Sequence, residues 1–336
     1  MPTVFLTHPQ DALHNYYGPR AIEALQALAE VRFNPLDREL SPAELIEAAK
    51  DCVCIVSYRG TPGSAELFAQ LPKLVSFSRC AIDIRNIDVN AASAHGILVT
   101  QASAGFIPSV SEWIIGTMID LGRHVTASSE SYHRGEVPAA AMGRELRHST
   151  LGVIGYGQIS RYLCRLATAF GMRVVVSDPF AAVDDPAVTQ LGQEALLEQS
   201  DFVVCLAVAN EQTENLMNAE AFARMRPGAY FINASRGNLV DEAALLAALD
   251  SGHIAGCAMD VGRAPDQMPS PELARHPRAI ATPHTGGLTP QAIEHQAMDT
   301  VRQVEAILQG RVPEGAVNAA HAKRLRRLDC TNAVAS

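Results

Sequence analysis

Short apolar runs alternate with amphipathic segments from the N-terminus of this chain onward. Several of the runs are rich in β-branched residues, which is typical of strands buried on both faces of a parallel sheet. The segments between them place apolar residues three and four positions apart, as an amphipathic helix does. We therefore predict an α/β fold, with helices covering both faces of parallel sheets.

The predicted strands fall into two groups. The first group comprises 4–7, 31–33, 52–57, 74–78 and 97–100. The second comprises 151–154, 173–177, 202–206, 229–232, 254–259 and 279–281. Because a chain of 336 residues is long for a single compact core, we expect one domain for each group.

Two Ser-x-x-Glu sequences of the capping-box type predict helix starts, at 41–44 and at 109–112. The second box is followed by an apolar helix containing Trp113, which we expect to carry the chain from one domain to the other. A helix predicted over 290–308 would return the chain to the first domain. The chain is thus expected to pass between the domains twice.

Residues 151–179 have the strand–turn–helix–strand pattern of a dinucleotide-binding unit. Gly155 and Gly157 form a tight turn before a helix whose N-terminal N–H groups and dipole would face a pyrophosphate. Asp178 ends the next strand, where its carboxylate can accept hydrogen bonds from a ribose diol. The third fingerprint position holds Ser160 in place of glycine. The alternative is a plain βαβ turn that binds no ligand.

Asp178 also distinguishes between the two nicotinamide cofactors. A carboxylate at this position repels the 2′-phosphate of NADP. The next residues, Pro179 and Phe180, supply no positive charge that could bind that phosphate. The sequence therefore predicts NAD.

Composition and charge narrow the class of protein. The net charge of −9 argues against a general nucleic-acid-binding surface. The seven cysteines form no C-x-x-C pair and several lie in apolar strands, which indicates a reducing compartment. Since the N-terminus lacks a signal-peptide pattern and no apolar run reaches transmembrane length, we expect a cytoplasmic protein without a membrane partner. No metal-ligand spacing, nucleophile elbow or Walker loop is present, and no metal is predicted.

Two polar residues directly follow predicted strands of the second group. Arg236 follows the strand at 229–232, and its planar fork can hold a carboxylate through two hydrogen bonds. His284 follows the strand at 279–281, and its ordinary pKa suits proton transfer near neutral pH. Because the carboxyl ends of parallel strands line one ligand crevice, both side chains are candidates for the same active site. Taken alone, the arginine could equally cap a loop, and a lone histidine is more often structural.

Together these features resemble the D-isomer-specific 2-hydroxyacid dehydrogenases, a family that includes glyoxylate reductases, phosphoglycerate dehydrogenases and formate dehydrogenase. The resemblance covers roughly residues 70–318. Besides the fingerprint with Asp178, its specific parts are Leu-Pro-Lys-Leu at 71–74, Asn-Ile-Asp at 86–88, Ser-Val-Ser-Glu at 109–112, Met-Arg-Pro-Gly at 225–228, Ile-Asn-Ala-Ser-Arg-Gly at 232–237, Met-Asp-Val at 259–261 and Thr-Pro-His-Thr-Gly-Gly at 282–287.

The resemblance implies two Rossmann-like, flavodoxin-like parallel-sheet domains, with the nucleotide domain inserted into a discontinuous substrate domain. Residues 1–103 and 285–320 would form the substrate domain, and residues 104–284 the NAD-binding domain. Residues 321–336 are expected to be a solvated C-terminal tail. The helix containing Trp113 would form the interface of a homodimer.

It also implies roles for individual residues. Arg236 would bind the carboxylate and carbonyl oxygen of a 2-oxo acid, and His284 would exchange the hydroxyl proton as the acid–base. Asp260 would hold the nicotinamide amide, and the amides of Ala81 and Ile82 would hold the substrate carboxylate. The cofactor would be contacted by Gly155, Tyr156, Gly157, Gln158, Ile159, Asp178, Val208, Ala234 and Gly286.

Several positions depart from the family pattern. Pro265 stands where a glutamate usually pairs with the histidine. We hypothesise that Asp266 takes its place, because an opposite charge favours imidazolium; the alternative is a solvated loop carboxylate. Asp83, in a substrate loop without glycine, would repel a second acidic group on the substrate or bind a hydroxyl or amine. Tyr58 and Gly60 occupy positions that hold arginines in the phosphoglycerate enzymes, which disfavours a phosphate ester.

The sequence therefore predicts an NAD-dependent oxidoreductase that interconverts a small D-2-hydroxy acid and its 2-oxo acid, as a homodimer and without a nucleic-acid partner. One alternative is an NAD(H)-sensing binding module of the same fold, which the missing glutamate and the unusual substrate loop would suit. The other is a phosphite- or formate-type dehydrogenase with the same architecture.

Overall fold

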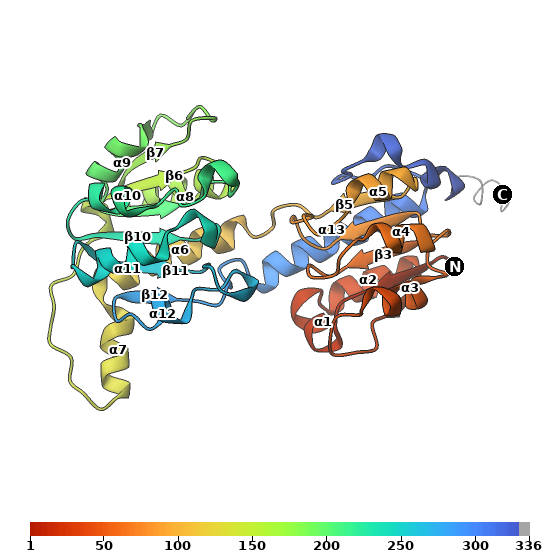
Figure 1. The fold of residues 1–336 in the computed structure, drawn as a ribbon, viewed down its shortest axis with the longest axis horizontal. Coiled ribbons are helices and arrows are strands. Elements are labelled where there is room, and N and C mark those ends of the chain that lie inside the picture. Colours follow the sequence, from red (N-terminus) through yellow and green to blue (C-terminus); the bar gives the residue numbers. More distant parts are fainter. Residues whose placement is uncertain (329–336) are drawn as a thin grey trace. The chain divides into compact units, whose positions relative to one another are not determined.

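The chain folds into two compact units in the computed structural model, which describes residues 1–328 except for the Asp266 side chain (Figure 1). Unit 1 consists of Met1–Phe106 and the chain from Thr289 onward, and unit 2 consists of Ile107–Leu288. The sequence predicted the domain boundaries after residues 103 and 284, which is three and four residues before the boundaries in the structure. Each unit is built on one parallel sheet, so the predicted fold class is confirmed.

Unit 1 has a five-stranded sheet in the order β2-β1-β3-β4-β5, with every neighbouring pair parallel. Its strands are β1 Thr3–Leu6, β2 Glu30–Phe33, β3 Cys54–Ser57, β4 Ser76–Arg79 and β5 Leu98–Gln101. Its helices are α1 Gln10–Tyr16, α2 Pro19–Leu28, α3 Pro42–Ala49, α4 Ala65–Gln70, α5 Val89–Ala94 and α13 Pro290–Leu308.

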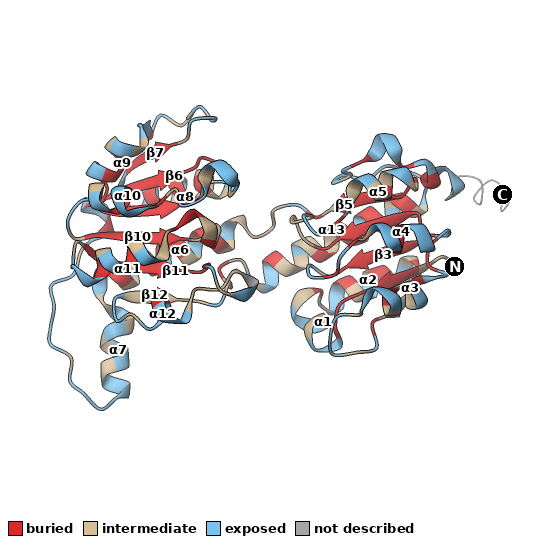
Figure 2. Cartoon of the chain, viewed as in Figure 1, coloured by how far each residue is buried: buried red, intermediate tan, exposed pale blue. Residues whose placement is uncertain are grey.

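Alternation along the strands gives unit 1 a core on each side of the sheet. Val4 and Leu6 enter an apolar cluster with α2 and α13, whereas Phe5 between them enters a cluster with α3, α4 and α5. The central strands of both units are buried along their whole length, β3 and β4 among them (Figure 2). This two-sided burial is the reason that the strands appear in the sequence as continuous apolar runs.

The two predicted capping boxes have different outcomes. Ser41 and Glu44 form a reciprocal box at the start of α3, as predicted. The box at 109–112 is wrong, because α6 begins at Ile107 and the hydroxyl of Ser111 donates to the Ile107 carbonyl inside the helix, at 2.9 Å. Pro108 is tolerated in the first helical turn, which allows the earlier start.

Unit 2 has a seven-stranded parallel sheet in the order β12-β11-β10-β9-β6-β7-β8. Its strands are β6 Thr150–Ile154, β7 Arg173–Ser177, β8 Val188–Gln190, β9 Phe202–Cys205, β10 Ala229–Asn233, β11 Ile254–Met259 and β12 Ala279–Ala281. Its helices are α6 Ile107–Arg123, α7 Val125–His133, α8 Gln158–Ala169, α9 Gln193–Gln199, α10 Ala219–Arg224, α11 Glu242–Asp250 and α12 Pro271–Ala274. The strand order reverses between β6 and β9, and ligands of such sheets bind at that switch point.

The first part of the C-terminal tail is packed against unit 1. The prediction of a solvated tail is therefore wrong for residues 322–325. Ala322 and Leu325 are buried in unit 1. The Arg324 guanidinium donates to the carbonyls of Leu71 and Leu74, at 2.7 and 2.8 Å. Leu71 is the C-cap residue of α4, where a cation is favourable. The sequence could not show this pairing because it joins positions far apart in the chain. Residues 329–336 of the tail lie outside the described part of the chain.

The described cysteines behave as small apolar side chains. All six are buried and carry free thiols, and burial raises the pKa of the Cys54 thiol to about 12. Such thiols are unreactive near neutral pH. Across residues 1–328, no helix is both long enough and apolar enough to cross a membrane.

His8 is a buried imidazole at the carboxyl edge of the unit 1 sheet, after β1. Its ring lies 5.1 Å from that of Tyr17 and 5.2 Å from that of Tyr58. Burial lowers the pKa of His8 to about 3; a backbone hydrogen bond at Tyr16 opposes this effect, and the charge of Arg79 adds to it. The ring is therefore neutral in the folded protein at ordinary pH.

We expect His8 to make the protein less stable as the pH falls below neutrality. An unfolded imidazole binds its proton near pH 6.5 and the folded one near pH 3, so the unfolded state binds more protons between these values. The contribution of His8 to the free energy of unfolding is fully present above pH 6.5. Below this pH it decreases, by at most about 1.4 kcal/mol per pH unit. In urea denaturation, His8→Phe, which keeps an aromatic ring in place, should show a flatter fall in unfolding free energy down to about pH 5. A slope equal to that of the wild type would contradict this expectation.

Candidate active site

The turn between β6 and α8 is shaped for close approach of a ligand. Gly155 has a φ of +93°, and a Cβ there would lie 2.8 Å from the backbone of Ala207 in the loop after β9. Gly157 caps α8, and a Cβ on it would meet no atom within 4 Å. The N-terminus of α8, at Gln158 and Ile159, therefore lies next to open space, which suits a pyrophosphate. The dinucleotide turn thus fits the cofactor that the sequence predicted.

Asp178 is fixed in place by backbone groups at the end of β7. Its carboxylate accepts hydrogen bonds from the backbone N–H groups of Tyr156, Phe180 and Ala181, at 2.7, 2.8 and 3.0 Å. Burial alone would raise the pKa of this carboxyl, but the three N–H donors outweigh burial and lower it. Asp178 is therefore a charged, preoriented acceptor beside the dinucleotide turn.

We expect Asp178→Asn to change the choice of cofactor. The substitution removes the charge that repels a 2′-phosphate and keeps one oxygen to accept a backbone hydrogen bond. The ratio of the NADPH Kd to the NADH Kd should fall by about tenfold, or about 1.4 kcal/mol, in fluorescence titrations of both cofactors. Glu198→Gln removes an exposed charge from α9 and is the matched control. An unchanged ratio in Asp178→Asn would contradict the assignment.

Ser160 occupies the third fingerprint position without preventing close packing of α8. It is buried, and its hydroxyl finds no hydrogen-bond partner among the described residues. The neighbouring carbonyl of Ile159 accepts a 3.3 Å hydrogen bond from Ser111 of α6. The small side chain therefore serves as a spacer between helix and sheet, as glycine would.

Arg236 is presented by a turn that its neighbours fix through hydrogen bonds. Asn233, at the buried end of β10, donates its side-chain amide to the Arg236 carbonyl at 2.9 Å and accepts from the Ser235 N–H at 3.1 Å. The Ser235 hydroxyl donates to the Ala207 carbonyl at 2.7 Å, which links this turn to the loop after β9. The side chain of Arg236 is half-buried, and that of Ala234 lies in the same turn. Sequence reasoning missed Asn233, although an asparagine ending a buried strand is a recognisable turn signal.

Asp260 organises the loop that carries His284. Its buried carboxylate accepts hydrogen bonds from the Thr282 hydroxyl at 2.6 Å and from the N–H groups of Thr285 and Gly286 at 2.8 Å each. The His284 N–H donates to the Asp260 carbonyl at 2.9 Å. The sequence assigned Asp260 only to the cofactor, and it included Thr282 in the motif at 282–287 without giving it a role of its own.

The backbone of His284 is held in an uncommon conformation. Its φ is +56°, in the left-handed region that residues other than glycine rarely adopt. Such a conformation persists only where the surroundings enforce it, and the contacts to Asp260 do so here. The backbone position from which the imidazole extends is thus fixed by the fold. This is the arrangement expected of a proton-transfer group.

The predicted substrate loop belongs to unit 1, whereas the groups described above belong to unit 2. The carbonyl of Ala81 accepts a 3.1 Å hydrogen bond from the Ala102 N–H. Asp83 is paired with Arg85, whose Nε and Nη2 lie 3.0 and 2.6 Å from its carboxylate. Ile82 lies between these two residues and is half-buried. The charge of Asp83 is therefore largely balanced within its own loop.

Two further predicted positions lie in loops of unit 2. Val208 is exposed after β9, where its side chain can present an apolar surface. The backbone of Asp266 belongs to the short helix η4 Pro265–Gln267, but its side chain lies outside the described part of the chain. Next to it, the Gln267 side-chain oxygen is buried without a hydrogen-bond partner among the described residues, a feature that the sequence did not suggest. No grouping of three His, Cys, Asp or Glu side chains suited to a metal occurs within residues 1–328.

Comparison with known proteins places these features in one family. The sequence profile described as D-isomer specific 2-hydroxyacid dehydrogenase, NAD binding domain, matches residues 115–286. D-3-phosphoglycerate dehydrogenase of Synechocystis sp. is 31% identical over 301 residues, which cover 88% of this chain and 54% of that enzyme. This chain thus spans about half the length of that relative. (S)-Sulfolactate dehydrogenase of Chromohalobacter salexigens is 34% identical over 271 residues, which cover 79% of this chain and 88% of that enzyme.

Solved structures show the same architecture. The D-lactate dehydrogenase of Lactobacillus jensenii, solved with NAD+, superposes with a TM-score of 0.82 over 94% of this chain and 99% of that one. Its sequence identity is 22%, so this likeness concerns the fold alone. The match of residues 115–286 confirms that NAD is the cofactor of unit 2.

Proposed function

Because the chain belongs to the D-isomer specific 2-hydroxyacid dehydrogenase family, we propose that it interconverts a D-2-hydroxy acid and the corresponding 2-oxo acid. One observation carries this proposal: Arg236 and His284 follow β10 and β12 at the edge of the sheet that also holds the dinucleotide turn. A fixed cation and a fixed proton donor are the two groups that reduction of a 2-oxo acid requires.

We infer that Arg236 and His284 have different roles in the reaction. The Arg236 guanidinium binds the carboxylate of the 2-oxo acid and stabilises the negative charge that develops on its carbonyl oxygen. The His284 imidazolium donates a proton to that oxygen, and in the oxidation direction the neutral imidazole accepts it. Bound NADH supplies the hydride that reaches carbon 2. Asp260 keeps the His284 loop in place in both reduction and oxidation.

We propose that the substrate lacks a phosphate or other second strong anion. Gly60 stands at one position where the phosphoglycerate enzymes carry arginine, and a Cβ on it would lie 1.9 Å from a carboxylate oxygen of Glu39. Tyr58 stands at the other position and packs its ring against that of His8. A carboxylate at this point repels a phosphate.

Two alternatives differ from this proposal in what they require of the chain. An NAD(H)-sensing module would bind the dinucleotide without needing Arg236 or His284 for turnover. A phosphite- or formate-type dehydrogenase would oxidise its substrate with NAD and would not reduce 2-oxo acids. We do not favour the sensing module, because the site holds both an arginine and a backbone-constrained histidine. The choice of substrate in the test below separates the phosphite- or formate-type alternative.

The proposal is tested by incubating the protein with NAD and matched pairs of D- and L-2-hydroxy acids of varied side chain. NADH formation is followed by absorbance. We expect turnover with the D member of at least one pair and none with its L partner. Turnover of an L member alone, or of formate or phosphite alone, would overturn the proposal.

We also propose a cytoplasmic location. The support is the free, buried state of all six described cysteines, which a reducing compartment preserves. Fractionation of the native host with an antibody to the protein is the direct test. A protein found mainly outside the cytoplasmic fraction would contradict this location.

A homodimer is proposed on the basis of an exposed arm at residues 124–145. The arm comprises α7 and the segment after it, which extend from the body of unit 2 (Figure 1). No residue of α7 is buried, and Val137 and Met142 are 83% and 97% exposed. Apolar side chains gathered on a projecting segment favour contact with a second copy. Trp113, which the sequence assigned to the interface, lies near Gly286 within its own unit.

We expect the double variant Val137→Glu, Met142→Glu to be monomeric in sedimentation velocity, whereas the wild type is a dimer. The introduced charges would have to be buried without partners at the interface. Val312→Glu, at an exposed position of unit 1, is the control and should remain dimeric. A monomeric wild type, or a double variant that still dimerises, would contradict the role of the arm.

A further inference from the structure

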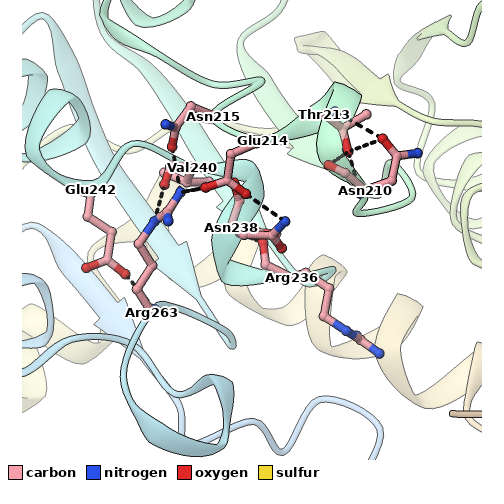
Figure 3. Close-up of polar contacts among 10 residues, drawn as sticks. Asn210, Thr213, Glu214, Asn215, Arg236, Asn238, Val240, Glu242 and Arg263 are labelled. Carbon is pink, nitrogen blue, oxygen red and sulfur yellow. Dashed lines mark hydrogen bonds and ion pairs between the residues drawn. The ribbon is translucent and has the colours of Figure 1, made fainter. Parts of the chain in front are cut away.

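Arg263 lies in the loop after β11 and reaches across to the turn that follows Arg236. Its Nε donates to the Val240 carbonyl, and its Nη2 donates to the Asn238 carbonyl, each at 3.0 Å. Asn238 is the middle residue of the short helix η3 Gly237–Leu239, which begins directly after Arg236, and Val240 is the residue that follows it. The Arg263 guanidinium thus holds, through two hydrogen bonds, the backbone that follows the predicted substrate-binding arginine (Figure 3).

A second set of contacts fixes the guanidinium itself. Its Nη2 also lies 2.9 Å from Glu214 Oε1 and 2.5 Å from the side-chain oxygen of Asn215. The other oxygen of Glu214 accepts a 3.0 Å hydrogen bond from the Asn238 side chain, which closes a ring of three residues. Hydrogen bonds from Asn238 and Arg263 lower the pKa of Glu214, so this carboxylate is charged near neutral pH. Arg263, Glu214 and Asn238 are called the buttress below.

The backbone of the two loops is also in direct contact. A Cβ on Gly237 would lie 1.9 Å from the carbonyl oxygen of Gly262, the residue before Arg263. The Arg236 carbonyl accepts from the Leu239 N–H at 3.4 Å, so a shift of η3 moves Arg236. In Figure 3 the Arg236 side chain points away from the buttress and takes no part in its hydrogen bonds. The buttress therefore supports the backbone of Arg236 and leaves its guanidinium to other contacts.

We propose that Arg263 is a positioning residue, which with Glu214 and Asn238 holds the Arg236 turn in the geometry that binds the substrate carboxylate. This inference rests on the proposed function. An arginine is needed because its planar fork reaches two backbone carbonyls and a carboxylate at once, whereas a lysine presents a single point charge. Small displacements of a binding arginine are costly, because reactions depend on alignment of the reacting groups.

Arg263→Met is expected to raise KM for the 2-oxo acid and to lower kcat, with a fall in kcat/KM of about 10- to 100-fold. Arg263→Lys should lie between this variant and the wild type. The Kd for NADH should stay within about twofold of the wild-type value, because the dinucleotide turn and Asp178 make no contact with the buttress. Affinity for oxamate, an unreactive 2-oxo acid analogue, should fall in the NADH complex of Arg263→Met.

Two further variants separate positioning from general loss of structure. Glu214→Gln removes one charge of the buttress and should reduce kcat/KM less than Arg263→Met does, with an unchanged thermal midpoint. Arg224→Met breaks exposed ion pairs on α10 in the same unit and is the matched control, with wild-type kinetics. Wild-type KM and kcat in Arg263→Met would overturn the inference, as would an equal loss of NADH affinity. If the wild type itself reduces no 2-oxo acid, it is the proposed function that fails.

Discussion

Replacing Arg236 with alanine should reduce kcat/KM for 2-oxo acid reduction by about a thousandfold, while the Kd for NADH stays near its wild-type value. The guanidinium is the one group that the proposed mechanism places on both the substrate carboxylate and the developing oxyanion. Removing one preorganised donor to such an oxyanion costs about 10²- to 10³-fold, and loss of the carboxylate contact adds to that effect. NADH binding should persist because its turn is held by Gly155 and Asp178.

The measurement combines steady-state kinetics with fluorescence titration of NADH. Arg236→Lys is the informative companion, since it keeps the charge and loses the two-pronged geometry. We expect this variant to recover only a small part of the activity. Arg226→Ala removes one of the two arginines that pair with Asp201 in the same unit, and it should leave the kinetics unchanged. Full activity in Arg236→Ala would refute the assignment of the site.

Substitution of His284 by asparagine should lower kcat by about 10²- to 10⁴-fold without weakening NADH binding. Asparagine is chosen because it tolerates the left-handed backbone that His284 adopts, at a φ of +56°, so the loop should keep its shape. Its amide cannot donate a proton in the pH range of interest, which removes the acid–base. The pH–rate profile of the residual activity should lose the limb that belongs to the histidine.

The same profile tests the proposed partner of His284. If the Asp266 carboxylate pairs with the imidazolium, it favours the charged ring, and Asp266→Asn should move that limb to lower pH. Gln267→Ala is the comparison variant, because the Gln267 oxygen is buried next to Asp266 without a partner among the described residues. A limb that stays in place in Asp266→Asn would exclude Asp266 as the partner. A limb that moves only in Gln267→Ala would assign the role to Gln267.

Much of the fold could be predicted from local patterns. The apolar runs marked the long buried strands because such strands are apolar on both faces. The short edge strand β8, with the sequence Val-Thr-Gln, could not be found in this way because two of its three residues are exposed. The start of α6 and the packing of Arg324 were mispredicted because each depends on contacts with other parts of the chain.

The candidate site was predictable to the extent that glycines and strand ends mark it. Gly155 and Asp178 occupy positions that only a dinucleotide turn explains well, and the structure gives each of them a matching geometry. The supporting residues were not predictable. Asp260 organises the His284 loop through three hydrogen bonds, and Arg263 contacts four residues at once, but neither arrangement has a fixed spacing in the sequence. Such networks depend on where loops meet in space.

The central claim, hydride transfer to carbon 2 of a 2-oxo acid, is tested most directly with NADH that carries deuterium at its transferable position. The protein is incubated with the labelled cofactor and a panel of 2-oxo acids. The products are separated on a chiral column, and their masses are measured by mass spectrometry. The account predicts a D-2-hydroxy acid with one deuterium on carbon 2 from at least one member of the panel. NADH that binds to the protein yet keeps its label with every 2-oxo acid would contradict it.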